Sequence, residues 1–269
     1  MKKLRPPVKT HGGKYYLCNW VIEHFPNDYK DLTYCEPCCG GASVFLNKEK
    51  ANEEIISDLD KGVVSIFKAL RDEPKEFTDR LKKIKYAEES FEKAQKKDTS
   101  AFDDYVEQAV NEYVLRRMSR GGLKKAFAWS ERLRGGKPGD VNAWETMLKM
   151  LPVLAERVKD TVILNNNFKD IIKVWDCENV LIYIDPPYLP TTRAEGSQNL
   201  YENEMSVEDH IDLLSAIRDA KGKVIVSGYN SPLYNKYLKG WKIVKKEVAN
   251  HSSQQKSKER RFECLWMNY

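Results

Sequence analysis

The side chains that could do chemistry stand out first in one tetrapeptide, Asp185-Pro186-Pro187-Tyr188. It directly follows the apolar run 180–184, which has the length of a buried strand. In open α/β sheets, ligands bind beyond the carboxyl ends of the strands, so a carboxylate at this point is placed for function. The two prolines restrict the backbone around it. The tetrapeptide therefore predicts a rigid loop that presents a carboxylate and an aromatic ring at the edge of a sheet.

The chemistry that fits this loop is activation of an amino group on a heteroaromatic ring. Such an amine is a poor nucleophile because its lone pair is delocalised into the ring. Two acceptors, the Asp185 carboxylate and the Pro186 carbonyl, could bind its two N–H groups and free that lone pair. Tyr188 offers a face on which a base extruded from a duplex can stack. Rate would then come from positioning and charge stabilisation, without a metal ion or a covalent intermediate.

A second motif, Glu36-Pro37-Cys38-Cys39-Gly40-Gly41, lies between the β-type run 32–35 and a helical run. Glycine lets a ligand approach the backbone, and a helix N-terminus favours a carboxylate. Asp58 ends the next β-type run, about twenty residues after Glu36, where nucleoside-binding α/β folds carry a ribose-hydroxyl acceptor. The strict dinucleotide pattern is absent, so these features predict a nucleoside cofactor without phosphates.

Strand and helix signals alternate at both ends of the chain. Helical runs cover 42–50, 61–71 and 206–220, and the last opens with a capping-box pattern at Ser206 and Asp209. The β-type runs are 32–35, 54–57, 161–164, 180–184, 223–227, 241–249 and 263–269. This alternation predicts an α/β fold with a sheet that is parallel at its centre.

The middle of the chain differs, because residues 72–157 show little strand signal and much charged, helical sequence. We predict a mainly helical domain at 72–157, inserted into a sheet domain formed by 1–71 and 158–269. An exposed loop is expected at 254–261, between the last two strands.

The net charge of +5 is concentrated in the inserted segment. Between residues 111 and 140, eight basic residues stand against three acidic ones, so this stretch accounts for the whole excess. Phe127, Trp129 and several glycines are interleaved with the charges, which fits a surface that meets phosphates better than a solvated helix face. We expect most of the candidate residues to contact phosphates and one or two to read bases, with a structural salt bridge as the alternative for any single one. The candidates are Arg116, Arg117, Arg120, Lys124, Arg132 and Arg134.

Composition excludes several classes of protein. With 41% hydrophobic and 32% charged residues, a sizeable core is expected rather than disorder. No apolar run approaches the roughly 18 residues that span a bilayer, and the basic N-terminus lacks a secretory apolar stretch. We therefore expect a cytoplasmic protein without a membrane partner. The six cysteines follow no regular framework and the four histidines are scattered, so we predict reduced thiols and no metal ion.

These motifs, with Gly12-Gly13-Lys14, resemble in type and order those of the Dam-type (D12 class, alpha group) DNA adenine-N6 methyltransferases. The matching segments cover nearly the whole chain and include 10–14, 36–47, 58, 185–188, 227–229 and 263–266. The resemblance implies a Rossmann-like domain that binds S-adenosylmethionine (SAM), an inserted target-recognition domain, and S-adenosylhomocysteine as product. It also implies a monomer of bacterial or phage origin that flips adenine out of double-stranded DNA.

The resemblance assigns roles residue by residue. Asp185, Pro186 and Tyr188 would meet the adenine. The implied cofactor contacts are Thr10, Lys14, Glu36, Pro37, Cys38, Gly40, Asp58, Asn167, Phe168 and Asp185.

The chain departs from the family pattern at several positions. Thr10 stands where the family often has Trp, Cys38 replaces a Phe, Ala42 replaces a glycine, and Asn167 replaces an Asp. The family's Asn-Arg-x-x-Phe-Asn-Gly stretch appears as the run 116–122, Arg-Arg-Met-Ser-Arg-Gly-Gly. The recognition sequence is therefore not predicted, and the tetranucleotide GATC is not assumed to be the DNA target.

Other readings stay open at this point. The same acceptor-Pro-Pro-Tyr loop would serve a methyltransferase acting on cytosine N4, on adenine in RNA or on a glutamine side chain. A DNA-binding relative without catalysis is a further alternative, although Asp185 and Tyr188 argue against it. The sequence also leaves open whether a restriction enzyme accompanies the chain in a restriction–modification system.

Overall fold

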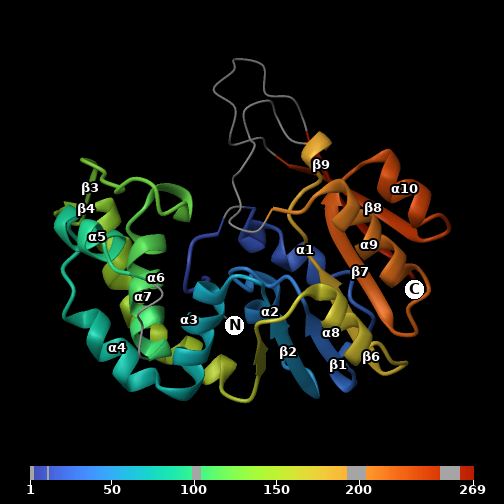
Figure 1. The fold of residues 1–269 in the computed structure, drawn as a ribbon, viewed down its shortest axis with the longest axis horizontal. Helices are drawn as coiled ribbons and strands as arrows, with labels where there is room; N and C mark the ends of the chain where they lie inside the picture. The colour runs from blue at the N-terminus through green and yellow to red at the C-terminus, as the bar shows by residue number, and fades with distance from the viewer. Residues whose placement is uncertain (1–2, 11, 99–103, 193–203, 249–260) are drawn as a thin grey trace. The chain divides into compact units, whose positions relative to one another are not determined.

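The structure is a computed structural model, and it describes residues 3–10, 12–98, 104–192, 204–248 and 261–269. The described strands include one seven-stranded sheet in the order β5-β2-β1-β6-β7-β9-β8 (Figure 1). Its strands are β1 (Thr33–Glu36), β2 (Glu53–Ser57), β5 (Val162–Leu164), β6 (Val180–Ile184), β7 (Lys223–Tyr229), β8 (Lys242–Val248) and β9 (Arg261–Met267). Each predicted strand is present, with bounds that differ from the prediction by at most two residues.

The centre of the sheet is parallel, as predicted. β1 pairs in parallel with β2 and β6, and β6 pairs in parallel with β7. The last two strands are antiparallel, since β9 pairs with both β7 and β8. Every residue of β6 is buried, which is typical of a central strand covered on both faces. The mixed α/β fold is therefore confirmed, and its parallel strands share one carboxyl edge.

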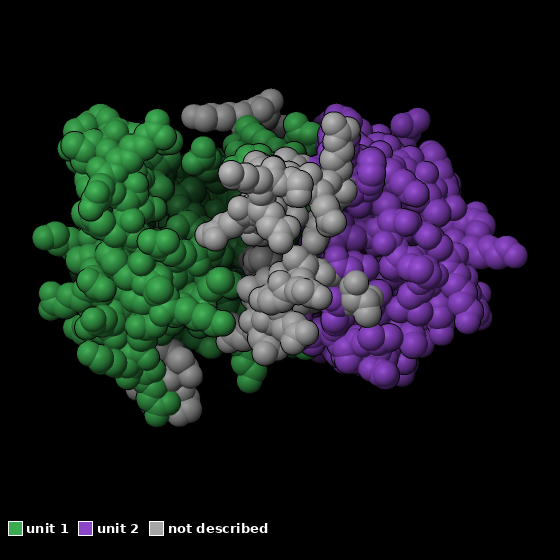
Figure 2. Space-filling view, turned by 90° about the horizontal axis from the view of Figure 1, so that it is seen from above, with its two compact units in different colours: residues 1–19, 40–48, 58–165 green, residues 20–39, 49–57, 166–269 purple. Residues whose placement is uncertain are grey.

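The chain forms two compact units, which Figure 2 distinguishes by colour. One comprises residues 1–19, 40–48 and 58–165, and the other comprises 20–39, 49–57 and 166–269. The domain boundaries predicted from the sequence, at residues 71/72 and 157/158, differ from the boundaries of these compact units. The functional division into two domains stays a prediction.

The first unit is mainly helical. Its longer helices are α3 (Lys61–Asp72), α4 (Pro74–Lys82), α5 (Glu88–Gln95), α6 (Tyr105–Arg117) and α7 (Gly139–Val158). α3 packs against α6 and α7, around buried rings such as Tyr113 and Trp144, whose centroids lie 5.4 Å apart. The unit also contains η1 (Lys14–Tyr16), α2 (Ser43–Asn47), η4 (Arg120–Gly122), β3 (Leu133–Arg134) and β4 (Lys137–Pro138).

In the second unit, helices pack beside the strands of the sheet. They are η2 (Tyr29–Asp31), α8 (Phe168–Trp175), η5 (Pro190–Thr192), α9 (Val207–Arg218) and α10 (Pro232–Tyr237), while α1 (Cys18–Ile22) crosses the boundary between the units. The capping box predicted at Ser206 and Asp209 is present and opens α9. His210 of α9 is fully buried, and its Nδ1 lies 2.8 Å from the Tyr234 hydroxyl. Its burial and this hydrogen bond indicate a structural role.

Residues 254–260 of the expected exposed loop lie outside the described residues, whereas Arg261 already belongs to β9. Within the described ranges, none of the helices has the length and apolar character required to cross a bilayer.

Candidate active site and nucleic-acid surface

The Asp185 carboxylate is held by a side chain from the neighbouring strand. Asp185 follows β6 directly, and the Ser227 hydroxyl on β7 donates to its Oδ1 at 2.9 Å. The Tyr183 hydroxyl lies 3.1 Å from the same serine oxygen. With Ser227 donating to the carboxylate, Tyr183 donates to Ser227, and both hydroxyls are buried. A chain of two hydrogen bonds therefore fixes the orientation of Asp185.

The Tyr188 ring is fixed from two sides. Its hydroxyl donates to Oε2 of the buried Glu263 on β9 at 3.0 Å. Its face stacks on Tyr229, with 4.2 Å between the ring centroids and 16° between the planes. A surface pocket lies beside the ring, lined by Pro186, Pro187, Tyr188, Leu189, Ser227, Gly228, Tyr229 and Tyr234. The resemblance includes Ser227, Tyr229 and Glu263 in its matching segments but assigns them no role.

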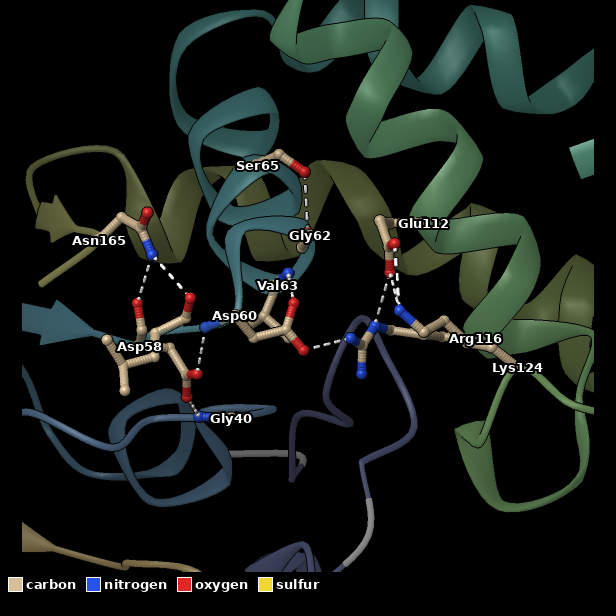
Figure 3. Close-up of polar contacts among 11 residues, drawn as sticks. Gly40, Asp58, Asp60, Gly62, Val63, Ser65, Glu112, Arg116, Lys124 and Asn165 are labelled. Atoms are coloured by element: carbon tan, nitrogen blue, oxygen red, sulfur yellow. Dashed lines mark hydrogen bonds and ion pairs between the residues drawn. The ribbon is translucent and has the colours of Figure 1, made fainter. Parts of the chain in front are cut away.

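A second carboxylate, Asp58, follows β2 directly and is bound by backbone N–H groups (Figure 3). Gly40 donates to Oδ2 at 2.7 Å, and Asp60 donates to Oδ1 at 2.9 Å. The Asn165 amide donates to the Asp58 carbonyl at 2.8 Å. Burial raises the pKa of the Asp58 carboxyl, and the two N–H donors oppose that rise. The structure thus brings Asp58 and the glycine turn within hydrogen-bond distance of each other.

The glycine turn is packed closely by the N-terminal segment. Gly40 has a φ of +48°, a conformation that favours glycine. A Cβ on Gly41 would lie 3.1 Å from Cβ of Pro6 and 3.3 Å from Oγ1 of Thr10, so a side chain here would push these neighbours away by a few tenths of an ångström. Ala42 also has a positive φ, 51°, at the start of α2. The substitution of the family's glycine by Ala42 therefore falls at a left-handed position.

The remaining predicted cofactor residues lie in both units. Lys14 begins η1 and is buried, and η1 packs against α2. Glu36 ends β1, is buried, and accepts a hydrogen bond from the Tyr34 hydroxyl at 2.6 Å. Pro37 is buried and Cys38 is half-buried. Asn167 caps α8 by accepting from the Lys169 N–H at 2.9 Å, and the next residue, Phe168, is buried.

Three of the predicted basic residues are engaged within the protein. Arg116 is buried and forms ion pairs with Asp60 and Glu112, so the structural alternative to a DNA contact holds for it. Lys124 forms an ion pair with Glu112, with 3.2 Å between its Nζ and Oε1 of the glutamate. Arg117 is half-buried and its Nη2 donates to the Ala143 carbonyl at 3.4 Å, while its buried Nε has no hydrogen-bond partner among the described residues. Burial lowers the pKa of this guanidinium.

The other three basic residues, Arg120, Arg132 and Arg134, are exposed. Arg134 lies on a hairpin in which β3 and β4 are joined by Gly135 and Gly136, with φ of 59° and 78°. Two consecutive left-handed residues suit the tight turn of a two-residue hairpin. This hairpin was not predicted, although a Gly-Gly pair between two short segments is its signal in the sequence.

All six cysteines are free thiols, and the residues that the structure describes contain no cluster of three or more His, Cys, Asp or Glu side chains suited to a metal ion.

The parallel α/β sheet and the Asp-Pro-Pro-Tyr loop at its carboxyl edge define a methyltransferase of Rossmann-like fold. The family model for "D12 class N6 adenine-specific DNA methyltransferase" matches residues 11–251, and the chain belongs to that family. The protein is thus a DNA adenine methyltransferase, as the sequence resemblance predicted. Of the substrates left open above, the family's own is adenine in DNA.

Two curated relatives match over nine-tenths or more of their own length. A type II methyltransferase, M.MjaIII from Methanocaldococcus jannaschii, is 24% identical, with 99% of this chain and 100% of the relative covered. The DNA adenine methylase of Haemophilus influenzae is 23% identical, with 95% and 90% covered. Among solved structures, the rRNA methyltransferase aviRa from Streptomyces viridochromogenes matches at 12% identity and a TM-score of 0.41, covering 94% of this chain and 84% of that one.

Proposed function

We propose that this enzyme uses SAM to methylate N6 of an adenine flipped out of duplex DNA, with Asp185 at the reacting amine. A bound SAM would supply a methyl carbon attached to a positively charged sulfur, and S-adenosylhomocysteine would be the product. The observation that carries the proposal is the Asp185 carboxylate, fixed by Ser227 at the carboxyl end of β6. Family membership supplies the reaction class and DNA as the substrate.

The residues of the loop divide the work at the adenine. The Asp185 carboxylate and the Pro186 carbonyl accept from the two N6 hydrogens and free the nitrogen lone pair. As the new carbon–nitrogen bond forms, positive charge builds on the nitrogen, and the adjacent carboxylate stabilises it and takes the departing proton. Tyr188 stacks on the base and keeps it in the reactive orientation.

The cofactor residues fit a nucleoside with a carboxylate tail. Asp58 offers a carboxylate whose position is set by two backbone N–H groups, which suits the two hydroxyls of a ribose. The turn at Gly40 admits a ligand close to the backbone. We propose Thr10, Lys14, Glu36, Pro37, Cys38, Gly40, Asp58, Asn167, Phe168 and Asp185 as the residues that contact SAM.

We propose that the exposed basic residues Arg120, Arg132 and Arg134 bind the phosphates of the DNA. Two apolar side chains lie exposed in the same stretch, Trp129 at 50% and Leu133 at 62%. Basic groups mixed with exposed apolar ones suit a DNA duplex that is opened for base flipping. Because Arg116, Arg117 and Lys124 are engaged within the protein, we do not include them among the phosphate contacts.

The decisive test combines three measurements on Asp185→Ala. Methyl transfer to DNA should be abolished while DNA binding stays largely intact, and calorimetry should show SAM binding weakened by the loss of one contact rather than abolished. Single-molecule sequencing of DNA exposed to the wild-type enzyme and SAM should report N6-methyladenine and also reveal the recognition sequence. Retained methylation by the variant, or a wild-type protein that takes up no SAM, would contradict the proposal. The monomeric state predicted from the sequence is checked by light scattering with and without a DNA duplex.

A further inference from the structure

We infer that Arg116 is a positioning residue for the cofactor carboxylate Asp58 and that it acts through Asp60. This inference rests on the proposed role of Asp58 in SAM binding and adds to it a residue of the run 116–122, which the resemblance aligns with a motif of the target-recognition domain. The relevant contacts lie within one compact unit and are drawn in Figure 3.

Asp60 is the link between the two residues. Its backbone N–H donates to Oδ1 of Asp58 at 2.9 Å. Its own carboxylate is held twice, because Oδ1 accepts from the Val63 N–H at 3.1 Å and Oδ2 pairs with the Arg116 guanidinium. The first contact caps α3 and the second ties the same residue to α6. Since both contacts fix the backbone at residue 60, they also fix the N–H that orients Asp58.

The side chain of Arg116 is itself held in place by several contacts. Its Nε donates to Oε2 of Glu112, one turn earlier on α6, at 3.0 Å. Nζ of Lys124 in turn donates to Oε1 of Glu112 at 3.2 Å. A Cβ on Gly62 would lie 2.4 Å from the Glu112 side chain, so a larger residue at this position would displace Glu112 from its place beside Arg116. The guanidinium therefore reaches Asp60 from a fixed place and has only 7% of its side-chain surface exposed.

Charge gives Arg116 a second effect on Asp58. Burial is the largest cause of the raised pKa at Asp58, and the charge of Asp60 adds to it. The N–H groups of Asp60 and Gly40 and the positive charge of Arg116 act in the opposite direction. Removing the guanidinium should therefore raise the pKa of Asp58 further, so that a ribose acceptor is lost to protonation at a higher pH.

Arg116 stands where the family's motif has asparagine, which carries no charge and cannot form this ion pair. The basic residue in the motif thus serves the cofactor side of the protein rather than a phosphate. Its neighbour in the same run, Arg120, is exposed and provides a matched control.

The test is calorimetric titration of SAM into the full chain between about pH 5 and pH 8. For Arg116→Met, we expect affinity to fall on the order of tenfold at neutral pH, within the usual range for coupled sites. The fall of SAM affinity at acidic pH, which forms the acid limb of a plot of affinity against pH, should also move to higher pH. Arg116→Lys keeps the charge, so its acid limb should stay near that of the wild type although its binding is weaker. Arg120→Met should change neither the affinity nor the limb.

The possible outcomes separate this inference from the proposed function. If Asp58→Ala loses SAM but Arg116→Met binds as the wild type does, with an unmoved limb, the inference is wrong and the cofactor site stands. If the wild type binds no SAM, the proposed function fails first. If Arg116→Met does not fold, as judged by its melting curve, Asp60→Asn carries the test. That variant should weaken SAM binding while Arg120→Met does not, and unchanged affinity would overturn the inference.

Discussion

The ring of Tyr188 lies flat against Tyr229, with 4.2 Å between centroids, while its hydroxyl donates to Glu263. Stacking and hydrogen bonding thus act on the same side chain from two different strands, β7 and β9. A ring held in this way is already oriented before a base arrives, which lowers the entropy lost on binding.

This relationship predicts that Tyr188→Ala and Tyr188→Phe differ. Stacking on a base contributes about 1–3 kcal/mol, so the alanine variant should lose on the order of tenfold to a hundredfold in kcat/KM. The phenylalanine variant keeps the ring and should lose less than about tenfold. It removes one hydrogen bond to the buried Glu263 carboxylate, so the melting temperature of the variant should fall. Methylation kinetics and thermal melts measure both effects, and equal kinetic losses in the two variants would exclude a stacking role.

Ser227 offers a second prediction, because its hydroxyl is the donor that orients Asp185. Ser227→Ala should reduce kcat on the order of tenfold, since a misplaced acceptor matters mainly in the transition state. SAM affinity should change little. Tyr183→Phe is the control, since it removes the hydroxyl behind Ser227 and leaves the serine to donate to Asp185. Single-turnover rates at saturating SAM should decrease in the order wild type, Tyr183→Phe, Ser227→Ala. A lower rate for Tyr183→Phe than for Ser227→Ala would contradict this role of Ser227.

Much of the framework was predictable from sequence because local signals carry it. Strand β6 has a continuous apolar run, and the loop after it has two prolines, so the place of Asp185 followed directly. The capping box of α9 lies within four consecutive residues and was equally readable. These features depend on neighbours in the chain rather than on the tertiary fold.

The parts that sequence could not supply depend on distant partners. Arg116 pairs with Asp60, which is 56 residues away, and a count of charges cannot tell which arginine finds a buried carboxylate. Glu263 meets Tyr188 because β9 pairs with β7, an order that no local pattern encodes. The hairpin of β3 and β4 has two-residue strands, too short for periodicity to reveal.

The exposed arginines predict a salt dependence that can be localised. Each phosphate contact contributes about 0.9 to the slope of log K against log salt concentration. Reversal of Arg132 and Arg134 to Glu should therefore reduce the slope by about two. Lys75→Glu is the control, since this lysine is exposed on α4, outside the basic segment. Fluorescence anisotropy with a duplex over a range of salt measures the slope, and a double variant that keeps the wild-type slope would remove the hairpin from the DNA surface.

Ala42 provides the last prediction, because it holds a φ of 51° where the family has glycine. A left-handed conformation costs about 1–2 kcal/mol for a residue with a Cβ. Ala42→Gly relieves that strain but loses a buried methyl, about 0.8 kcal/mol, and gains unfolded-state entropy worth about 0.4–1 kcal/mol. The free energy of unfolding should therefore change by less than about 1 kcal/mol. Ala69→Gly, at a fully buried position within α3, has no strain to relieve and should cost about 1–2 kcal/mol. Urea denaturation compares the two, and equal losses would show that Ala42 is not strained.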